Sequence, residues 1–177
     1  FNCSVGNSTS MIDPISYATF VAASVALILV PGPAQALAMS NTLTGGWGAG
    51  ALTAIGLNIG TLFHAVAAAF GLSALLATSA LAFSVVKYIG AAYLIYLGVQ
   101  ALRSKAQQTL TAPTSHSKQS PLKQAILIGT LNPKVALFFL AFLPQFVDQN
   151  QGSVVGQIIF LGATMAVLDT LYELALV

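Results

Sequence analysis

The chain has 177 residues, of which 56% are hydrophobic and only 6% are charged, and its formal net charge is +2. A soluble domain carries roughly a quarter charged residues, so the composition indicates an integral membrane protein. The small net charge, without a basic block, excludes nucleic acid as a partner. With Cys3 as the single cysteine, one chain can form neither a disulfide nor a thiolate metal cluster.

The first ten residues look unrelated to the rest of the chain, and Met11 is a candidate natural start. We therefore expect an extension at 1–10 and a single domain at 11–177. A secretory signal peptide is the competing interpretation of the first apolar run, because Ala36–Ala38 lies in an A-x-A pattern. No Lys or Arg precedes that run, which argues against cleavage.

Long apolar runs succeed one another along the chain. A helix needs about 20 apolar residues to cross a bilayer, and these runs are too long for barrel strands of about ten residues. The sequence therefore predicts an all-α integral membrane protein. Its five predicted spans are Ile15–Thr42, Ala49–Ala77, Ala80–Leu102, Leu122–Leu143 and Val154–Val177.

Two of these spans contain proline in their interior. Pro31, Gly32 and Pro33 interrupt the first span, and Asn132 with Pro133 interrupts the fourth. Proline cannot donate a backbone hydrogen bond, and an unsatisfied backbone group in lipid costs several kcal/mol. The breaks must therefore face protein, water or a ligand. The alternative is an ordinary proline kink at each position.

The two breaks suggest an internal repeat, because Pro33 and Pro133 lie 100 residues apart. The halves would be 15–102 and 122–177, joined by a linker at 103–121. Three spans in each half is an odd number, so the halves would form an inverted repeat whose broken helices meet near the midplane. The repeat of about 100 residues also predicts a sixth helix after residue 177. We therefore expect the chain to be truncated before that helix.

Each break also restarts a helix, since Gly32 and Asn132 are plausible N-caps directly before a proline at the first helical position. The free N–H groups near the midplane would then attract an anion. Two such helix starts, approaching from opposite leaflets, would suit a carboxylate. The N–H groups expected to be free are those of Ala34, Gln35, Ala36, Lys134, Val135 and Ala136.

The loops indicate an orientation. Four of the six Lys and Arg residues lie between Arg103 and Lys123, so the positive-inside rule places this linker in the cytoplasm. The polar loop at 144–153 carries one acid and no base and is expected outside. Alternation then places the N-terminus outside as well.

Ionisable groups inside the spans are functional candidates by default. Lys134 lies about 18 Å from the cytoplasmic end of its span, at a helix start that disfavours a cation. It therefore needs an anion, either a substrate carboxylate or Asp169. A purely structural Lys134–Asp169 pair is the alternative. Glu173 is expected near the cytoplasmic interface, in contact with water.

In the second span Gly56, Gly60 and His64 recur at a spacing of four, so they share one helix face. The glycines form a small-xxx-small packing stripe. His64 could relay protons or bind substrate, or it could hydrogen-bond a neighbouring helix. Asn58 offers a further hydrogen bond within the span.

These motifs together resemble the LysE/RhtB-type amino-acid exporters over about residues 11–177. The resemblance rests on PGP at 31–33, the glycine and histidine stripe, KYIGAAYLIYLG at 87–98, and NPK at 132–134 followed by FFLAFLPQFV at 138–147. It implies six helices, often a homodimer, in the bacterial inner membrane, and proton-driven efflux of amino acids such as threonine, homoserine or leucine. The turn at 45–48 departs from the family because it lacks basic residues.

The sequence thus predicts a secondary exporter rather than an enzyme, with no cofactor and no metal. Its partners would be an amino acid, protons and the lipid bilayer, and the resemblance implies that a homodimer is possible. Inorganic-ion efflux and a non-transporting membrane subunit are the alternatives. Asp169 and His64 would contact the substrate ammonium or carry the proton. The predicted substrate-binding residues are Pro31, Gly32, Pro33, Gln35, Asn58, Asn132, Pro133 and Lys134.

Overall fold

All secondary structure in the described part of the chain is helical, which confirms the all-α prediction. The computed structural model describes residues 12–103, 120–148 and 150–177, so the extension at 1–10 and most of the linker at 103–121 lie outside it. The α-helices are α1 (Pro14–Leu29), α2 (Pro33–Thr78), α3 (Ala80–Arg103), α4 (Pro121–Thr130), α5 (Pro133–Leu137) and α6 (Val154–Leu176). A π-helix η1 (Phe138–Phe142) and a 3-10 helix η2 (Leu143–Phe146) come after α5.

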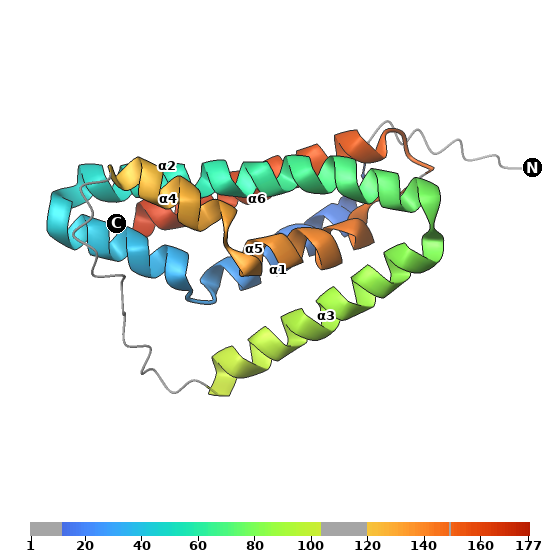
Figure 1. Cartoon of the computed structure of the whole chain (residues 1–177), viewed down its shortest axis with the longest axis horizontal. Coiled ribbons are helices and arrows are strands. Elements are labelled where there is room, and N and C mark those ends of the chain that lie inside the picture. Colours follow the sequence, from blue (N-terminus) through green and yellow to red (C-terminus); the bar gives the residue numbers. More distant parts are fainter. Residues whose placement is uncertain (1–11, 104–119, 149) are drawn as a thin grey trace, which may run out of the picture.

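Helix α2 is a hairpin of two limbs rather than one rod. Gly46 has φ 77° and ψ 179° inside it, a backbone conformation that L side chains rarely adopt and glycine adopts freely. The Asn41 side-chain amide donates to Thr53 Oγ1 across the hairpin at 2.8 Å. Figure 1 shows the first limb leaving the centre of the molecule and the second limb running back along it. The turn predicted at 45–48 is therefore confirmed.

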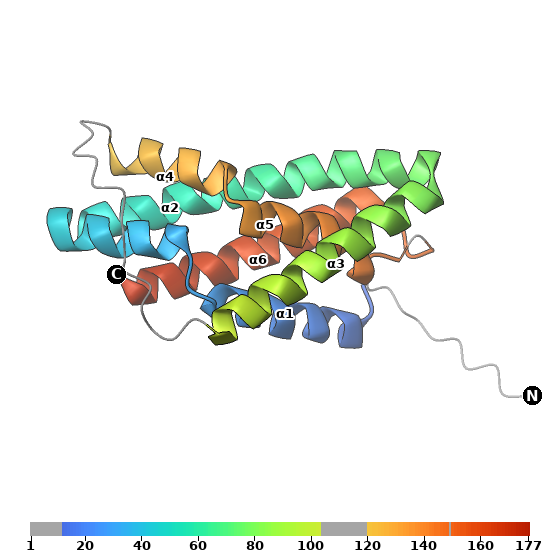
Figure 2. The same ribbon diagram turned by 60° about the horizontal axis from the view of Figure 1, so that its bottom comes forward.

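The fourth predicted span is also segmented, as α4, α5, η1 and η2 in series. Pro121 starts α4 behind the N-cap Ser120, whose hydroxyl accepts from the backbone N–H of Lys123. Figures 1 and 2 show that α1 and the α4–α5 series run in opposite directions and break near the same level. This antiparallel course is what an inverted repeat requires, although the repeat as a whole stays a prediction.

The most extensive contact between helices joins α2, along its second limb, to α4. A Cβ at Gly56 would lie 2.7 Å from Ala125 Cβ, and a Cβ at Gly129 would lie 2.6 Å from Leu57 O. Only glycine permits this approach. The packing stripe predicted from Gly56 and Gly60 is therefore confirmed, and it holds α4 in register so that the break after it faces the centre.

The outer surface is apolar, as expected for a protein in lipid. Pro33–Leu75, Pro121–Phe146 and Val154–Leu176 are long and apolar enough to cross a membrane, and Pro14–Leu29 and Leu81–Tyr93 are shorter apolar helices. Large side chains such as Phe63, Phe70 and Leu171 are exposed along them. A soluble protein rarely exposes such continuous apolar surface, so the chain is a multi-pass membrane protein.

Candidate functional site

The first break separates α1 from α2 and is closed by one side chain. Gly32 is extended, with φ −147° and ψ 179°, and is the N-cap of α2. Its N–H donates to Gln35 Oε1 at 2.9 Å, and Gln35 Nε2 donates to the Ile28 carbonyl at 2.6 Å. Gln35 therefore satisfies one group on each side of the break. Because two helix ends are joined by extended backbone here, the break is more than a proline kink.

The second break separates α4 from α5 and is capped by Asn132. Its side-chain oxygen accepts from the Lys134 N–H at 3.1 Å, while its own N–H donates to the Gly129 carbonyl at 3.2 Å. Pro133 occupies the first helical position, where a missing N–H costs nothing. The N-caps predicted at Gly32 and Asn132 are thus both confirmed.

The two breaks meet in space through Lys134. Its Nζ donates to the Val30 carbonyl at 2.7 Å, a contact between residues 104 apart in sequence. Val30 is the C-cap of α1, so its carbonyl has no partner inside that helix. The Lys134 side chain also passes Gly32, where an added Cβ would lie 4.0 Å from its Cδ. A backbone carbonyl freed by the first break is therefore satisfied by a side chain from the second.

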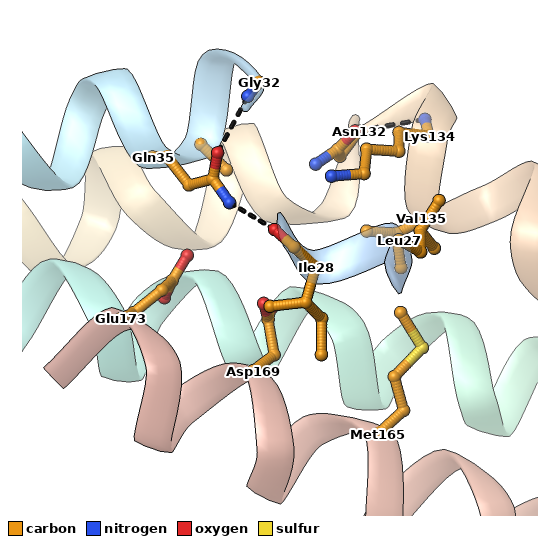
Figure 3. Close-up of a pocket in the computed structure, with 11 residues that line it drawn as sticks. Leu27, Ile28, Gly32, Gln35, Asn132, Lys134, Val135, Met165, Asp169 and Glu173 are labelled. Atoms are coloured by element: carbon orange, nitrogen blue, oxygen red, sulfur yellow. Dashed lines mark hydrogen bonds between the residues drawn. The ribbon is translucent and has the colours of Figure 1, made fainter. Parts of the chain in front are cut away.

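A small pocket lies where the breaks meet. Its lining comes from α1, the start of α2, the second break with α5, and α6. Figure 3 shows Lys134 entering from the second break and Asp169 and Glu173 entering from α6. The lining residues are Leu27, Ile28, Gly32, Ala34, Gln35, Asn132, Lys134, Val135, Met165, Asp169 and Glu173.

Half of the ten predicted site residues line this pocket, namely Gly32, Gln35, Asn132, Lys134 and Asp169. Pro31, Pro33 and Pro133 are absent from the lining, because they shape the breaks and do not face the pocket. Sequence reasoning missed the apolar wall, which comprises Leu27, Ile28, Val135 and Met165. These residues have no signal in a chain that is apolar throughout.

The charges of the pocket face one another across helices. The carboxylates of Asp169 and Glu173 act on the Lys134 ammonium through space, yet within the described residues Lys134 forms no direct ion pair with Asp169 and instead donates to Val30. Asp169 is half-buried and has no hydrogen-bond partner in the described part of the chain. Its carboxylate is thus available to a ligand.

Glu173 is not a wet interface residue, contrary to the expectation from sequence. It is only 1% exposed, and its Oε2 accepts from Asn58 Nδ2 at 3.3 Å. Asn58 itself is 5% exposed and stands outside the lining, so it reaches the pocket only through Glu173. The signal that could have found Glu173 is its spacing of four from Asp169, which places both acids on one face of α6.

His64 lies beside the second break but outside the pocket. Its ring interacts with the backbone of Gly129 and Thr130 at the end of α4, which fits the expected contact with a neighbouring helix. Its Nε2 is buried and has no hydrogen-bond partner of good geometry among the described residues. A role for His64 in proton transfer stays a prediction.

Fewer backbone N–H groups are free than the sequence suggested. Ala36 donates to the Gly32 carbonyl and Ala136 donates to the Asn132 carbonyl, because the fourth residue after an N-cap already closes the first helical turn. The Lys134 N–H is held by the Asn132 side chain. The expectation was wrong for these three groups.

Comparisons with known proteins show sequence similarity to membrane proteins. An uncharacterized membrane protein of Vibrio cholerae is 39% identical over 154 residues, which cover 86% of this chain and 74% of that protein. The uncharacterized membrane protein YrhP of Bacillus subtilis is 35% identical over 173 residues, covering 92% and 81%. A homoserine/homoserine lactone efflux protein of Salmonella typhi is 34% identical over 151 residues, covering 85% and 73%.

No solved structure matches the chain significantly. The family description "LysE type translocator" matches residues 25–177, a range that contains both breaks and the whole lining of the pocket. With relatives of this similarity over most of its length, the chain belongs to the LysE type translocator family.

Proposed function

We propose that this protein is a secondary active exporter of small neutral amino acids or their derivatives, driven by exchange for protons. Membership of a translocator family supports transport, and the relative named for homoserine and homoserine lactone efflux supports the substrate class. The observation that carries the proposal is the pocket itself, in which one lysine at a helix break faces two acids from α6.

Lys134 would hold the substrate carboxylate. An ammonium group has three N–H donors, and one of them is used by the Val30 carbonyl. The other two are available to a ligand, next to the start of α2, where helix N-termini favour negative charge. Ala34 and Gln35 lie in the same lining. A carboxylate placed here would interact with both the Lys134 ammonium and the N-terminus of α2.

Asp169 would hold the substrate ammonium. Its carboxylate lacks a hydrogen-bond partner among the described residues and lines the pocket opposite the breaks. The apolar wall of Leu27, Ile28, Val135 and Met165 would receive a small uncharged side chain. The carboxylate, the ammonium and the side chain of an α-amino acid would therefore each have a partner in the pocket.

Transport would result from rocking one half of the chain against the other around this pocket. We infer a location in the bacterial inner membrane with the N-terminus outside and the loop at 103–121 in the cytoplasm. A homodimer is the expected assembly. His64 remains a candidate for carrying protons, although it stands outside the pocket lining.

The alternatives have less support. In the described ranges 12–103, 120–148 and 150–177, no group of three or more His, Cys, Asp or Glu side chains is placed to hold a metal ion, so no observation favours inorganic-ion efflux. A non-transporting subunit would have no need of an acid that lacks a hydrogen-bond partner within a pocket.

Export by Lys134→Ala cells tests the proposal, with Lys123→Ala as the matched control. Both lysines lie on the segmented fourth span, but Lys123 is exposed in the first turn of α4. We expect Lys134→Ala to lose export and Lys123→Ala to retain it, across a panel of threonine, homoserine and leucine. Equal export by wild type and Lys134→Ala would refute the mechanism.

Thermal stability in detergent with each added ligand separates the alternatives. Stabilisation by an amino acid supports the proposal, since a ligand that binds only the native state raises the melting temperature. Stabilisation by a divalent metal ion would favour ion efflux. Stabilisation by neither would favour the non-transporting subunit.

A further inference from the structure

Glu173 is the most enclosed ionisable group in the pocket lining. It is 1% exposed, whereas Asp169, one turn earlier on α6, is half-buried. Its hydrogen-bond partner is a neutral amide, Asn58 Nδ2 at 3.3 Å. A proton can reach such a position, whereas the half-buried Asp169 presents more of its surface to a ligand as large as an amino acid.

Asn58 is held in place by a second bond. Its Nδ2 also donates to the Ala54 carbonyl at 3.1 Å, which directs the amide toward α6. Its Oδ1 is buried and has no hydrogen-bond partner among the described residues. A buried acceptor without a partner is costly, and a protonated Glu173 carboxyl is the adjacent group that could donate to it after a small rotation.

The charges in the pocket do not balance. The charged groups that act on Glu173 are Asp169 from its own helix and Lys134 from α5, and α2 contributes the neutral Asn58. One lysine and two ionised acids give a net charge of −1 in the lining. Because an uncompensated buried charge is unfavourable, the pocket is most stable when it holds one further positive charge.

We propose that Glu173 carries one proton while the pocket is empty and releases it when a ligand with a net positive charge binds. The O–H bond of the carboxyl breaks, the proton leaves to the solution on the side from which the ligand entered, and the ligand supplies the replacing charge. When the ligand leaves on the opposite side, a proton from that side binds Glu173. One proton is exchanged for one ligand.

This inference rests on the proposed function and narrows its coupling to a class of substrates. A zwitterionic amino acid adds no net charge, because Lys134 meets its carboxylate and Asp169 meets its ammonium, so the proton stays on Glu173. An amino-acid amide or ester has an ammonium but no carboxylate, and its charge of +1 displaces the proton. Proton-coupled export therefore belongs to derivatives whose carboxyl group is masked.

Proton release on binding tests this without any variant. Purified wild-type protein in weakly buffered detergent at about pH 6, where α-amino groups are protonated, receives L-threonine or the nearly isosteric L-threoninamide. Calorimetry measures binding and an indicator dye measures protons. We expect about one proton released per bound threoninamide and none per bound threonine. Equal release with both ligands, or none with threoninamide, would overturn the inference.

The variant Glu173→Gln then tests whether Glu173 is the group that releases the proton. Asp148→Asn is the matched control, because Asp148 is an exposed acid outside the pocket. We expect Glu173→Gln to abolish the release and to weaken threoninamide binding by about tenfold or more. The control should release protons like wild type. Release that persists in Glu173→Gln contradicts the assignment. If neither ligand binds wild type, the proposed function fails and this inference fails with it.

Discussion

The contact between α2 and α4 predicts a large effect from one methyl group. In Gly129→Ala the new Cβ would lie 2.6 Å from Leu57 O and 3.0 Å from Leu57 Cα. Carbon–oxygen contacts of this kind are normally about 3.3 Å or longer, so the two helices would have to separate by about 0.7 Å. Both atoms belong to the backbone, so no change of side-chain rotamer can relieve the clash.

Overpacking a well-packed interior costs about 1–3 kcal/mol, and we expect Gly129→Ala to lower the free energy of unfolding by this amount. The backbone of α2 has no free space into which it can move. It is already in close contact with α4 at Gly60, where an added Cβ would lie within 3.0 Å of the backbone of Gly129 and Thr130. Asn132 lies three residues later, so the displacement should also disturb the second break and reduce export.

Unfolding of the purified protein by denaturant in detergent measures the effect, with Gly71→Ala as the control. Gly71 lies on the same limb of α2, and a Cβ there would meet no atom within 4 Å. Its replacement should leave stability unchanged or raise it by up to about 1 kcal/mol, since alanine favours helix more than glycine does. If Gly129→Ala is as stable as wild type, the close approach of α2 and α4 is wrong.

Substitutions at three further positions test the local chemistry of the helices, each by the same unfolding measurement. Asn132→Ala should cost about 1 kcal/mol through loss of the N-cap, whereas Asn132→Asp should retain the cap; equal losses would argue against capping. Gln35→Glu keeps an acceptor for Gly32 but loses the donor to Ile28, so it should cost about 1–3 kcal/mol, and an unchanged stability would contradict that buried bond. Ser24→Ala removes a buried hydroxyl that has no partner among the described residues, so it should be neutral or stabilising; a loss above about 1 kcal/mol would show that the hydroxyl has a partner.

The positions of the breaks and of the hairpin turn were predictable from the sequence. Proline lacks its N–H in any context, so Pro31, Pro33 and Pro133 cannot continue a preceding helix, whereas Pro33 and Pro133 can begin the next one. Glycine tolerates positive φ for an equally local reason, which explains the turn at Gly46. The stripe of Gly56 and Gly60 indicated a close helix contact, although not the partner.

The meeting of the breaks and the burial of Glu173 were decided only by the tertiary structure. Lys134 reaches Val30 because the breaks that end α1 and α4 lie at the same height along the molecule. No local sequence pattern determines that height. Glu173 is buried because α6 turns it toward Asn58, whereas its distance from the helix end suggested water. Proline and glycine act on their own backbone, but the environment of a charged side chain depends on helices distant in sequence, and the rotation and depth of those helices are set by packing.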